Sequence, residues 1–367
     1  MKHVNIPIFI PHVGCPFTCI FCNQRHIASQ LEPLSPSAIP ELVDQHLATI
    51  PPGSEIEIAF FGGSFTMMDV SLQEAYLRQV SPYLIKGLIH GLRLSTRPDG
   101  IDPDILKMLK YWGVDTVELG VQSCDDEVLA AAGRGMALLQ IVGASRLLKE
   151  YGFKLGIQLM VGLPGDNRLK DLATTRVIIG LRPDMVRIYP TLVIAGTELA
   201  RQWREGSYQE FSLPEAVSVC AEMLLMFQYH HIPVIRLGLQ PSQELQSAET
   251  LLAGPYHPAF GELVEQHIFY MQARELLLDA QALPGRDRPV NLLVNPADVS
   301  RLIGQHRRNF LRLEEELGTG LLKVIKSEAI ASDSLGLYYS GENRILTLVR
   351  EDFIRRLIDR GLLPGED

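Results

Sequence analysis

The chain has 367 residues, of which 46% are hydrophobic and 21% charged, a composition typical of a globular protein with a sizeable buried core. Its formal net charge of -9 argues against a chain that binds polyanions over its whole surface, so a nucleic-acid site would have to be a local basic patch. No apolar run approaches the roughly 18 residues of a membrane-spanning helix, and the N-terminus lacks a cleavage site of small residues. We therefore expect a cytoplasmic protein without a membrane partner.

Apolar runs alternate with amphipathic stretches over the first two-thirds of the chain, which is the pattern of β/α units around a parallel sheet. The predicted strands are 4–10, 55–61, 89–95, 116–121, 153–160 and 184–189, and the predicted helices are 36–49, 71–85, 102–111, 138–151 and 167–180. Six units are fewer than the eight of a closed barrel, so the pattern predicts an α/β fold with a partial (β/α)6 barrel of the TIM type. A helix near 213–230 and a strand at 232–238 are expected to close its open side.

The pattern changes after about residue 240. A loop-like segment with Gly254 and Pro255 precedes a helix predicted at 260–278, and PGRDRP follows as a linker. The remaining elements are predicted as strand 289–295, helix 297–303, a break at Gly304, helix 308–317 and strand 321–326. We expect three parts, namely the barrel (1–240), a connecting helical segment (241–286) and a small C-terminal α/β domain (287–367).

Three of the five cysteines, Cys15, Cys19 and Cys22, have the spacing C-x3-C-x2-C. An odd total and no export signal argue against a disulfide framework, and clustered thiols in a reducing compartment are more often metal ligands or redox groups. Three thiolates can hold a [4Fe–4S] cluster and leave the fourth iron open to S-adenosylmethionine. One electron from the cluster would cleave that molecule to methionine and a 5′-deoxyadenosyl radical, which abstracts hydrogen from an unactivated C–H bond.

The position of the three cysteines supports this hypothesis. They follow the first strand directly, which places them at the C-terminal mouth of the barrel, and Phe21 would shield the cluster from water. The alternatives are three buried thiols or a zinc site completed by His12 or His26, since no second C-x2-C occurs. The other two cysteines, 124 and 220, are predicted to be core residues, although the first of them follows a strand and could face the cavity.

This cysteine loop is the signature of the radical S-adenosylmethionine superfamily, and further motifs extend the resemblance over residues 4–240. They are FFGGSFT (60–66), RLSTRPDGI (93–101), VELGVQS (117–123), GRGM (133–136), GIQLMVGLPG (156–165) and RIYPTLVIAGTEL (187–199). In this order they resemble the subgroup that contains the Elp3-type tRNA-modifying enzymes and the oxygen-independent coproporphyrinogen oxidases, and the last motif resembles the Elp3 type specifically.

The resemblance implies a set of residues that bind S-adenosylmethionine. They are Gly62, Gly63, Ser64, Ser95, Gln122, Arg134 and Gln158. The glycines would let the backbone approach the methionyl amino group, and Arg134 would offer its planar cationic fork to the carboxylate. Ser95 and Gln122 would contact methionine or ribose, Gln158 would contact the ribose hydroxyls, and residues 161–163 would pack near adenine.

Tyr189 and Arg187, on the last barrel strand, are expected to orient the substrate. Each of the residues carried over by resemblance also has a structural reading. The glycines can form an ordinary turn, Arg134 can be a surface arginine, the polar residues can be satisfied at strand ends, and Tyr189 can be a structural aromatic.

The chain departs from both relatives. Elp3 enzymes space their cysteines more widely and usually carry an acetyltransferase domain, but we find no acetyl-CoA pyrophosphate loop after residue 240. The coproporphyrinogen oxidases usually place a fourth cysteine just after the triad, whereas residues 23–26 are Asn-Gln-Arg-His. Neither acetyl-CoA-dependent carboxymethyl chemistry nor heme synthesis is therefore predicted.

Residues 288–327 read β-α-turn-α-β and resemble the core of a KH RNA-binding module, whose Gly-x-x-Gly loop clamps phosphates. The loop here is Gly304-Gln305-His306-Arg307, without the second glycine. A local basic patch surrounds it, formed by Arg301, His306, Arg307, Arg308 and Arg312. The alternative is a packing domain with a solvated arginine face.

Together these observations predict a radical S-adenosylmethionine enzyme that acts on RNA, with tRNA as the expected substrate held in part by the C-terminal patch. An electron donor such as flavodoxin or ferredoxin is the expected protein partner. One alternative is an enzyme of the same kind acting on a small molecule or a tetrapyrrole. Another is a non-catalytic iron–sulfur or heme-trafficking protein, against which the intact glycine motif and the polar strand ends argue.

Overall fold

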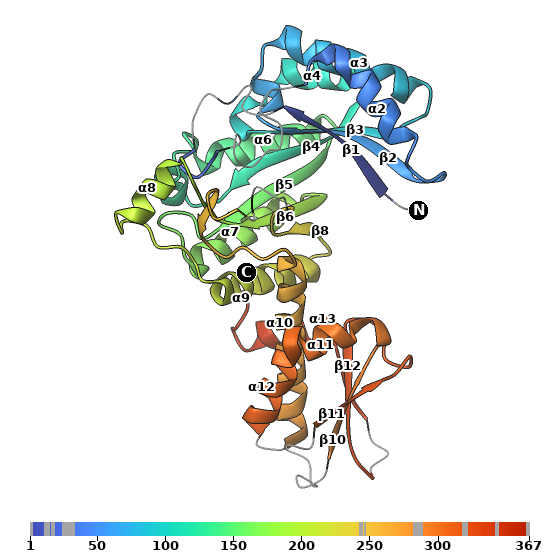
Figure 1. Cartoon of the computed structure of the whole chain (residues 1–367), viewed down its shortest axis with the longest axis vertical. Helices are drawn as coiled ribbons and strands as arrows, with labels where there is room; N and C mark the ends of the chain where they lie inside the picture. Colours follow the sequence, from blue (N-terminus) through green and yellow to red (C-terminus); the bar gives the residue numbers. More distant parts are fainter. Residues whose placement is uncertain are drawn as a thin grey trace. The chain divides into compact units, whose positions relative to one another are not determined.

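The computed structural model describes residues 3–10, 15, 19–23, 34–241, 245, 247–281, 289–317, 322–341 and 345–364. The chain forms two compact units (Figure 1): residues 1–212 and 232–256 make the first, and residues 213–231 and 257–367 make the second. The helix predicted at 213–230 therefore belongs to the second unit. The predicted domain boundaries at 240 and 286 stay predictions, because a compact unit is not by itself a part that folds alone.

The first unit is built on a seven-stranded sheet in which all neighbours are parallel (Figure 1). In sheet order its strands are β1 (His3–Ile10), β2 (Glu55–Gly62), β3 (Gly91–Thr96), β4 (Val114–Gln122), β5 (Lys154–Val161), β6 (Met185–Pro190) and β8 (Val234–Leu237). The order follows the chain, with β1 and β8 at its two ends. This confirms the predicted partial barrel, and β8 is the strand that was expected beside the sixth.

Helices return the chain between successive strands, as right-handed β/α crossovers require. They are α2 (Ile39–Leu47), α3 (Val70–Ile85), α4 (Pro103–Tyr111), α6 (Leu138–Glu150) and α7 (Arg168–Leu181), and two short helices, α5 (Asp126–Ala131) and α8 (Glu198–Arg204), follow β4 and β6. Several begin at a side-chain cap. Asp102 accepts from the backbone N–H groups of Asp104 and Ile105, and Asn167 accepts from Leu169 and Lys170.

Strand alternation puts polar residues on one face of the sheet. In β4, Val117 and Leu119 are completely buried and face one way, while Glu118 and Gln122 face the other. Because successive parallel strands end at the same edge, the polar residues at their carboxyl ends gather on one side of the molecule. This alternation is what assembles the candidate site.

A small antiparallel pair, β7 (Val193–Ile194) and β9 (Leu251–Ala253), completes the described elements of the first unit together with the 3-10 turns η1 (Pro36–Ala38), η2 (Phe65–Met67) and η3 (Pro98–Gly100). Sequence analysis did not predict β7 or β9. Strands of two and three residues are too short for a period-2 pattern to be recognised.

The second unit contains α9 (Leu213–Tyr229), α10 (Phe260–Gln281) and a four-stranded sheet in the order β11-β10-β12-β13. Its later elements are β10 (Val290–Val294), η5 (Pro296–Asp298), α11 (Val299–Ile303), η6 (Gln305–Arg307), α12 (Arg308–Leu317), β11 (Leu322–Lys326), β12 (Ser334–Tyr339), β13 (Leu346–Val349) and α13 (Arg350–Asp359). The predicted β-α-turn-α-β order is present, with β10 and β11 parallel. The likeness to a KH module stays a prediction. No helix in the described part of the chain is long and apolar enough to cross a membrane.

Candidate functional site

A cavity of about 330 Å³ opens at the carboxyl ends of β2 to β5. Its lining consists of Cys15, Cys19, Phe21, Cys22, Gly62, Gly63, Ser64, Ser95, Thr96, Arg97, Glu118, Gly120, Gln122, Arg134 and Gln158. The three predicted cluster ligands and all seven predicted cofactor-binding residues are in this set. Arg187, Tyr189 and Cys124 are not in it.

The described part of the cysteine loop is held by three hydrogen bonds to two other segments of the chain. The Ile20 N–H donates to the carbonyl of Ala132 at 3.2 Å, and its own carbonyl accepts from the Leu199 N–H at 2.8 Å. The Asn23 amide donates to the carbonyl of Ala195 at 2.9 Å. These bonds fix the backbone that carries the thiols to the loop after α5 and to the start of α8.

Two arginines approach the Cys19 thiol, which is buried. The Nη1 of Arg134 lies 3.2 Å from its sulfur, and the Nη1 of Arg97 lies 3.9 Å away. Burial raises the pKa of the Cys15 thiol and the neighbouring Cys19 raises it further, while the guanidinium groups of Arg97 and Arg134 oppose that rise. The two guanidinium groups therefore offset part of the rise in the pKa of Cys15 without reversing it.

No three His, Cys, Asp or Glu side chains in the described ranges converge closely enough to hold a single metal ion. An iron–sulfur cluster does not need such convergence, because each thiolate binds a different iron. His12 and His26, the predicted alternative ligands of a zinc site, lie outside the described residues.

The glycine motif after β2 packs directly against the end of β1. A Cβ on Gly62, whose φ is +110°, would lie 2.9 Å from the carbonyl oxygen of Ile10, and the Gly63 N–H donates to that oxygen at 2.7 Å. Gly62 is therefore required by the backbone itself, in agreement with the structural reading. The Ser64 hydroxyl is buried, where it bonds the Thr96 hydroxyl at 3.0 Å and accepts from the Arg97 N–H at 3.0 Å.

Arg134 is only 4% exposed, and one of its donors is unsatisfied. A terminal nitrogen, Nη2, donates to the carbonyl of Gly120, but Nε has no partner among the described residues. Buried polar groups are normally paired, so an unpaired guanidinium nitrogen in a cavity wall favours an anionic ligand there. Arg134 is not the surface arginine of the alternative reading.

Gln122 ends β4 with a φ of +74°, a conformation that is rare for residues other than glycine. Its Oε1 accepts from the Nε2 of Gln158 at 3.2 Å, so two of the predicted ribose contacts are linked. Gly120, two residues earlier, leaves room for this pair, because a Cβ there would lie 3.2 Å from the side-chain nitrogen Nε2 of Gln122.

Arg187 is held by a carboxylate rather than left free toward the cavity. Its Nε and Nη2 lie 2.6 and 3.1 Å from the two oxygens of Glu118. The same carboxylate accepts from Arg93 at 2.9 Å, and Arg93 in turn donates to Glu57 at 2.7 Å. This buried chain of alternating charges crosses the interior from β2 to β6, and it satisfies Arg187 structurally. Burial raises the pKa of the neighbouring Tyr189, and the charge of Arg187 opposes that rise.

Sequence reasoning did not single out Arg97 or Glu118. Both lie inside the quoted motifs and line the cavity. Glu118 is in β4, four residues before Gln122, and Arg97 is the first residue after β3, two residues beyond Ser95. Extending the period-2 alternation through β4 would have found Glu118, whereas Arg97 lies beyond the end of β3, where strand alternation no longer applies.

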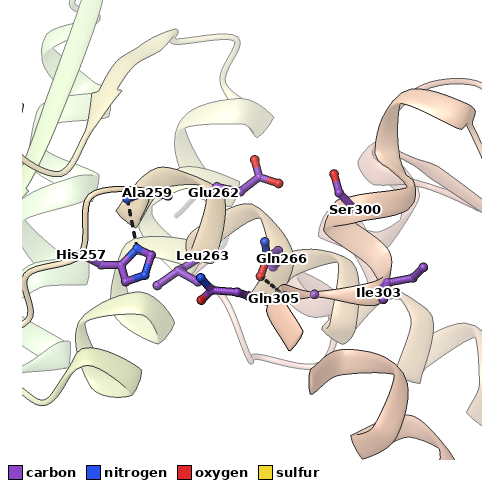
Figure 2. A pocket seen from close by; sticks show the side chains of 9 residues that line it. His257, Ala259, Glu262, Leu263, Gln266, Ser300, Ile303 and Gln305 are labelled. Atoms are coloured by element: carbon purple, nitrogen blue, oxygen red, sulfur yellow. Dashed lines mark hydrogen bonds between the residues drawn. The ribbon is translucent and has the colours of Figure 1, made fainter. Parts of the chain in front are cut away.

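The loop between α11 and α12 lies in the second unit, beside a groove of about 270 Å³ (Figure 2). The groove is lined by His257, Ala259, Glu262, Leu263, Gln266, Ser300, Ile303, Gly304 and Gln305. The Gln305 N–H donates to the Gln266 side chain at 2.9 Å, as Figure 2 shows, and the Asn309 amide donates to the Gln266 carbonyl at 2.7 Å. The loop is thereby tied to α10.

The predicted basic patch is smaller than the sequence suggested. Arg301 lies 3.2 Å from Asp298, and Arg312 lies 3.1 Å from Glu316. The remaining members, His306, Arg307 and Arg308, are exposed and have no carboxylate partner in the described ranges.

Two family models match successive parts of the chain. The model described as the radical SAM superfamily matches residues 9–175, and the one described as the Radical_SAM C-terminal domain matches residues 183–269. Together they match more than half of the chain, and the first covers the cysteine loop and the strands that line the cavity.

Individual relatives agree. The tRNA uridine(34) acetyltransferase of Dehalococcoides mccartyi is 29% identical over 240 residues, which are 56% of this chain and 52% of that protein. The enzyme of the same name from Methanocaldococcus jannaschii is 32% identical over 189 residues, 46% of this chain and 35% of that protein. The matched region thus spans about half or less of these relatives. The solved archaeal Methanocaldococcus infernus Elp3 with an N-terminal deletion has the same fold at a TM-score of 0.58 and 23% identity, covering 73% of this chain and 62% of that chain.

Proposed function

We propose that this chain, which belongs to the radical S-adenosylmethionine superfamily, modifies tRNA by radical chemistry. Members of the superfamily are enzymes that bind a [4Fe–4S] cluster and S-adenosylmethionine. The observation that carries the radical chemistry in this proposal is that three thiols, a buried arginine with an unpaired Nε and polar side chains from strand ends line one cavity.

The residues present fit these cofactors. Cys15, Cys19 and Cys22 supply three soft ligands from one loop, which suits iron and leaves one iron of a cubane open. The unpaired Nε of Arg134 suits the carboxylate of S-adenosylmethionine. The linked side chains of Gln122 and Gln158 offer amide groups to ribose hydroxyls.

Each part of the chain has a distinct role in the proposed mechanism. When bound, the cofactors supply the electron and the C–S bond whose cleavage yields a 5′-deoxyadenosyl radical. Arg134 would bind and orient the methionine carboxylate, and the backbone of residues 62–64 would contact the methionine amino group. Because the Ser64 hydroxyl is occupied by Thr96 and the Arg97 N–H, the contribution of Ser64 is through its backbone. Phe21 packs against the hydrophobic side chains of Val193, Leu199, Ala200 and Tyr208 and excludes water from the cavity wall.

The substrate proposal rests on the relatives and on the loop between α11 and α12. Relatives named as tRNA-modifying enzymes match the barrel. In the loop between α11 and α12, His306, Arg307 and Arg308 form an exposed basic group on a chain that is acidic overall. We do not extend the acetyltransferase activity in those names to this chain, because the match covers 52% of the first relative and 35% of the second. A flavodoxin or ferredoxin is the proposed electron donor.

The substrate is tested by mass spectrometry of modified nucleosides in tRNA from cells with and without the gene. Loss of one modified nucleoside, or accumulation of its precursor, is the expected result. An unchanged nucleoside profile from cells whose purified enzyme still releases 5′-deoxyadenosine would replace the tRNA proposal with a small-molecule or tetrapyrrole substrate.

The cofactor assignment is tested on anaerobically reconstituted protein with dithionite. The wild-type chain should show the brown absorbance of the cluster and release 5′-deoxyadenosine, and Cys19→Ala should lose both. Cys124→Ala is the matched control, since Cys124 is a buried thiol outside the cavity lining. Equal iron content in the two variants would contradict the assignment.

A further inference from the structure

Arg97 is buried beside the proposed cluster ligands, although no pattern in the sequence marked it as a cofactor residue. It is 4% exposed, lines the cavity and directs Nη1 toward the Cys19 sulfur at 3.9 Å. Arg134, equally buried, contributes its own Nη1 at 3.2 Å to the same sulfur. One thiol thus faces two guanidinium groups.

The position of Arg97 is fixed on several sides. Its Nε and Nη2 lie 2.8 and 2.9 Å from the two carboxylate oxygens of Asp99, which is a fork-to-fork ion pair. Nη2 also donates to the Arg134 carbonyl at 2.5 Å, and the Arg97 backbone N–H donates to Ser64. The guanidinium group therefore cannot swing away from the thiol without breaking these bonds.

The turn that carries Asp99 is itself packed tightly. η3 runs from Pro98 to Gly100, and a Cβ on Gly100 would lie 2.6 Å from the Cγ of Met67 and 2.6 Å from the Thr66 hydroxyl. Glycine at this position lets η3 lie against η2, which brings the Asp99 carboxylate back onto the Arg97 side chain. The sequence Arg-Pro-Asp-Gly thus fixes the position of the Arg97 guanidinium group.

We propose that Arg97 is a positioning residue that raises the reduction potential of the iron–sulfur cluster by acting on the Cys19 ligand, together with Arg134. Reduction adds one electron to the cluster core, from the 2+ to the 1+ state, and transfers no proton. Hydrogen bonds to ligand sulfur and nearby positive charge stabilise the more negative, reduced state. Two guanidinium groups face the carboxylate of Asp99, and the carboxylate of Glu118 in the cavity lining is already paired with Arg93 and Arg187, so the charge around the Cys19 sulfur is positive on balance. The inference rests on the proposed ligation by Cys19 and does not depend on the substrate.

The test is a dithionite titration of the reconstituted full chain, followed by electron paramagnetic resonance of the reduced cluster. Arg97→Gln should shift the midpoint potential to more negative values. Arg97→Lys, which keeps the charge but loses the fork, should give a smaller shift in the same direction. Asp99→Asn, which removes the opposing negative charge, should shift the midpoint to more positive values. Arg78→Gln, which removes a charge from the exposed face of α3, should leave it unchanged.

Opposite signs separate electrostatic tuning from damage to the fold, because a purely structural role would move both variants toward cluster loss. An unchanged midpoint in Arg97→Gln with full iron content, or shifts of the same sign in Arg97→Gln and Asp99→Asn, would overturn the inference. If Arg97→Gln does not retain iron, Arg97→Lys and Asp99→Asn decide. Failure of the ligation itself would be seen separately, as full iron content in Cys19→Ala.

Discussion

At the scale of single residues, Gly156 leaves room for the buried ion pairs that link β2, β3, β4 and β6. A Cβ at this position would lie 2.7 Å from the Cγ of Glu118, closer than real Cβ contacts come. Because glycine has no side chain, the Glu118 carboxylate has room to reach Arg93 and Arg187. The charged side chains of these ion pairs, Glu57, Arg93, Glu118 and Arg187, are each less than a fifth exposed, so each depends on the others for its hydrogen bonds.

We expect Gly156→Ala to displace Glu118 and to destabilise the chain by about 1–3 kcal/mol, the usual effect of overpacking a buried site. The measurement is urea unfolding followed by circular dichroism. Gly180→Ala is the matched control, because a Cβ on this exposed residue of α7 meets nothing within 4 Å and should leave stability unchanged or raise it. Equal stability of the two variants would contradict the argument.

At the scale of elements, the segment that joins β5 to α7 carries two neighbouring carboxyl groups. Asp166 accepts from the N–H groups of Gly162 at 3.2 Å and Asn167 at 2.8 Å. Asp171, in the first turns of α7, is 3% exposed, and its Oδ2 has no partner among the described residues. Burial raises the pKa of Asp171 well above its usual range, the nearby Asp166 raises it further, and burial also raises the pKa of Asp166.

A raised carboxyl pKa means that the folded state holds its proton more tightly than the unfolded chain does. The stability that this provides is present below the ordinary carboxyl pKa and is lost as the pH rises through the raised value. Asp171→Asn, which stays neutral, should therefore increase the melting temperature more at pH 8 than at pH 5. Thermal unfolding at both pH values checks this, with Asp104→Asn on the exposed face of α4 as the control. A gain that is larger at pH 5 would show that the sign is wrong.

At the scale of the whole molecule, the proposed RNA contact is positively charged, whereas the chain as a whole is negatively charged. The chain carries a formal net charge of -9, so exposed arginines without carboxylate partners are the groups able to bind phosphate. Arg307 lies 4.7 Å from the Phe310 ring centre and is exposed, as is Arg308. Arg312 instead shares the carboxylate of Glu316 with Arg274.

Replacing Arg307 and Arg308 together by alanine should weaken tRNA binding and reduce the slope of log K against log salt by about two, roughly one for each phosphate contact. Filter binding at several salt concentrations measures this. The control removes Arg274 and Arg312, two exposed arginines of the same unit that are already paired. The same loss of slope in both double variants, or binding insensitive to salt, would rule out the loop as the RNA contact.

The sequence by itself determined the local structure and the kind of chemistry. Each predicted barrel strand lies within about two residues of the observed one, as for 55–61 against Glu55–Gly62. Such elements depend on patterns of period 2 and 3.6 among near neighbours, which a single sequence displays. The cysteine spacing and the ordered motifs indicated the superfamily in the same way.

Only the tertiary structure decided which polar residues face one another. Arg97 and Cys19 are 78 residues apart, and Glu118 and Arg187 are 69 apart. The contacts of Arg187 with Glu118, and of Glu118 with Gly156, depend on strand order and register, which no local pattern encodes. The basic patch is a different case, because Asp298 and Glu316 lie only three and four residues from Arg301 and Arg312. Helical spacing in the sequence was therefore enough to show that these two arginines have carboxylate partners, and that His306, Arg307 and Arg308 are the exposed basic residues of the loop between α11 and α12.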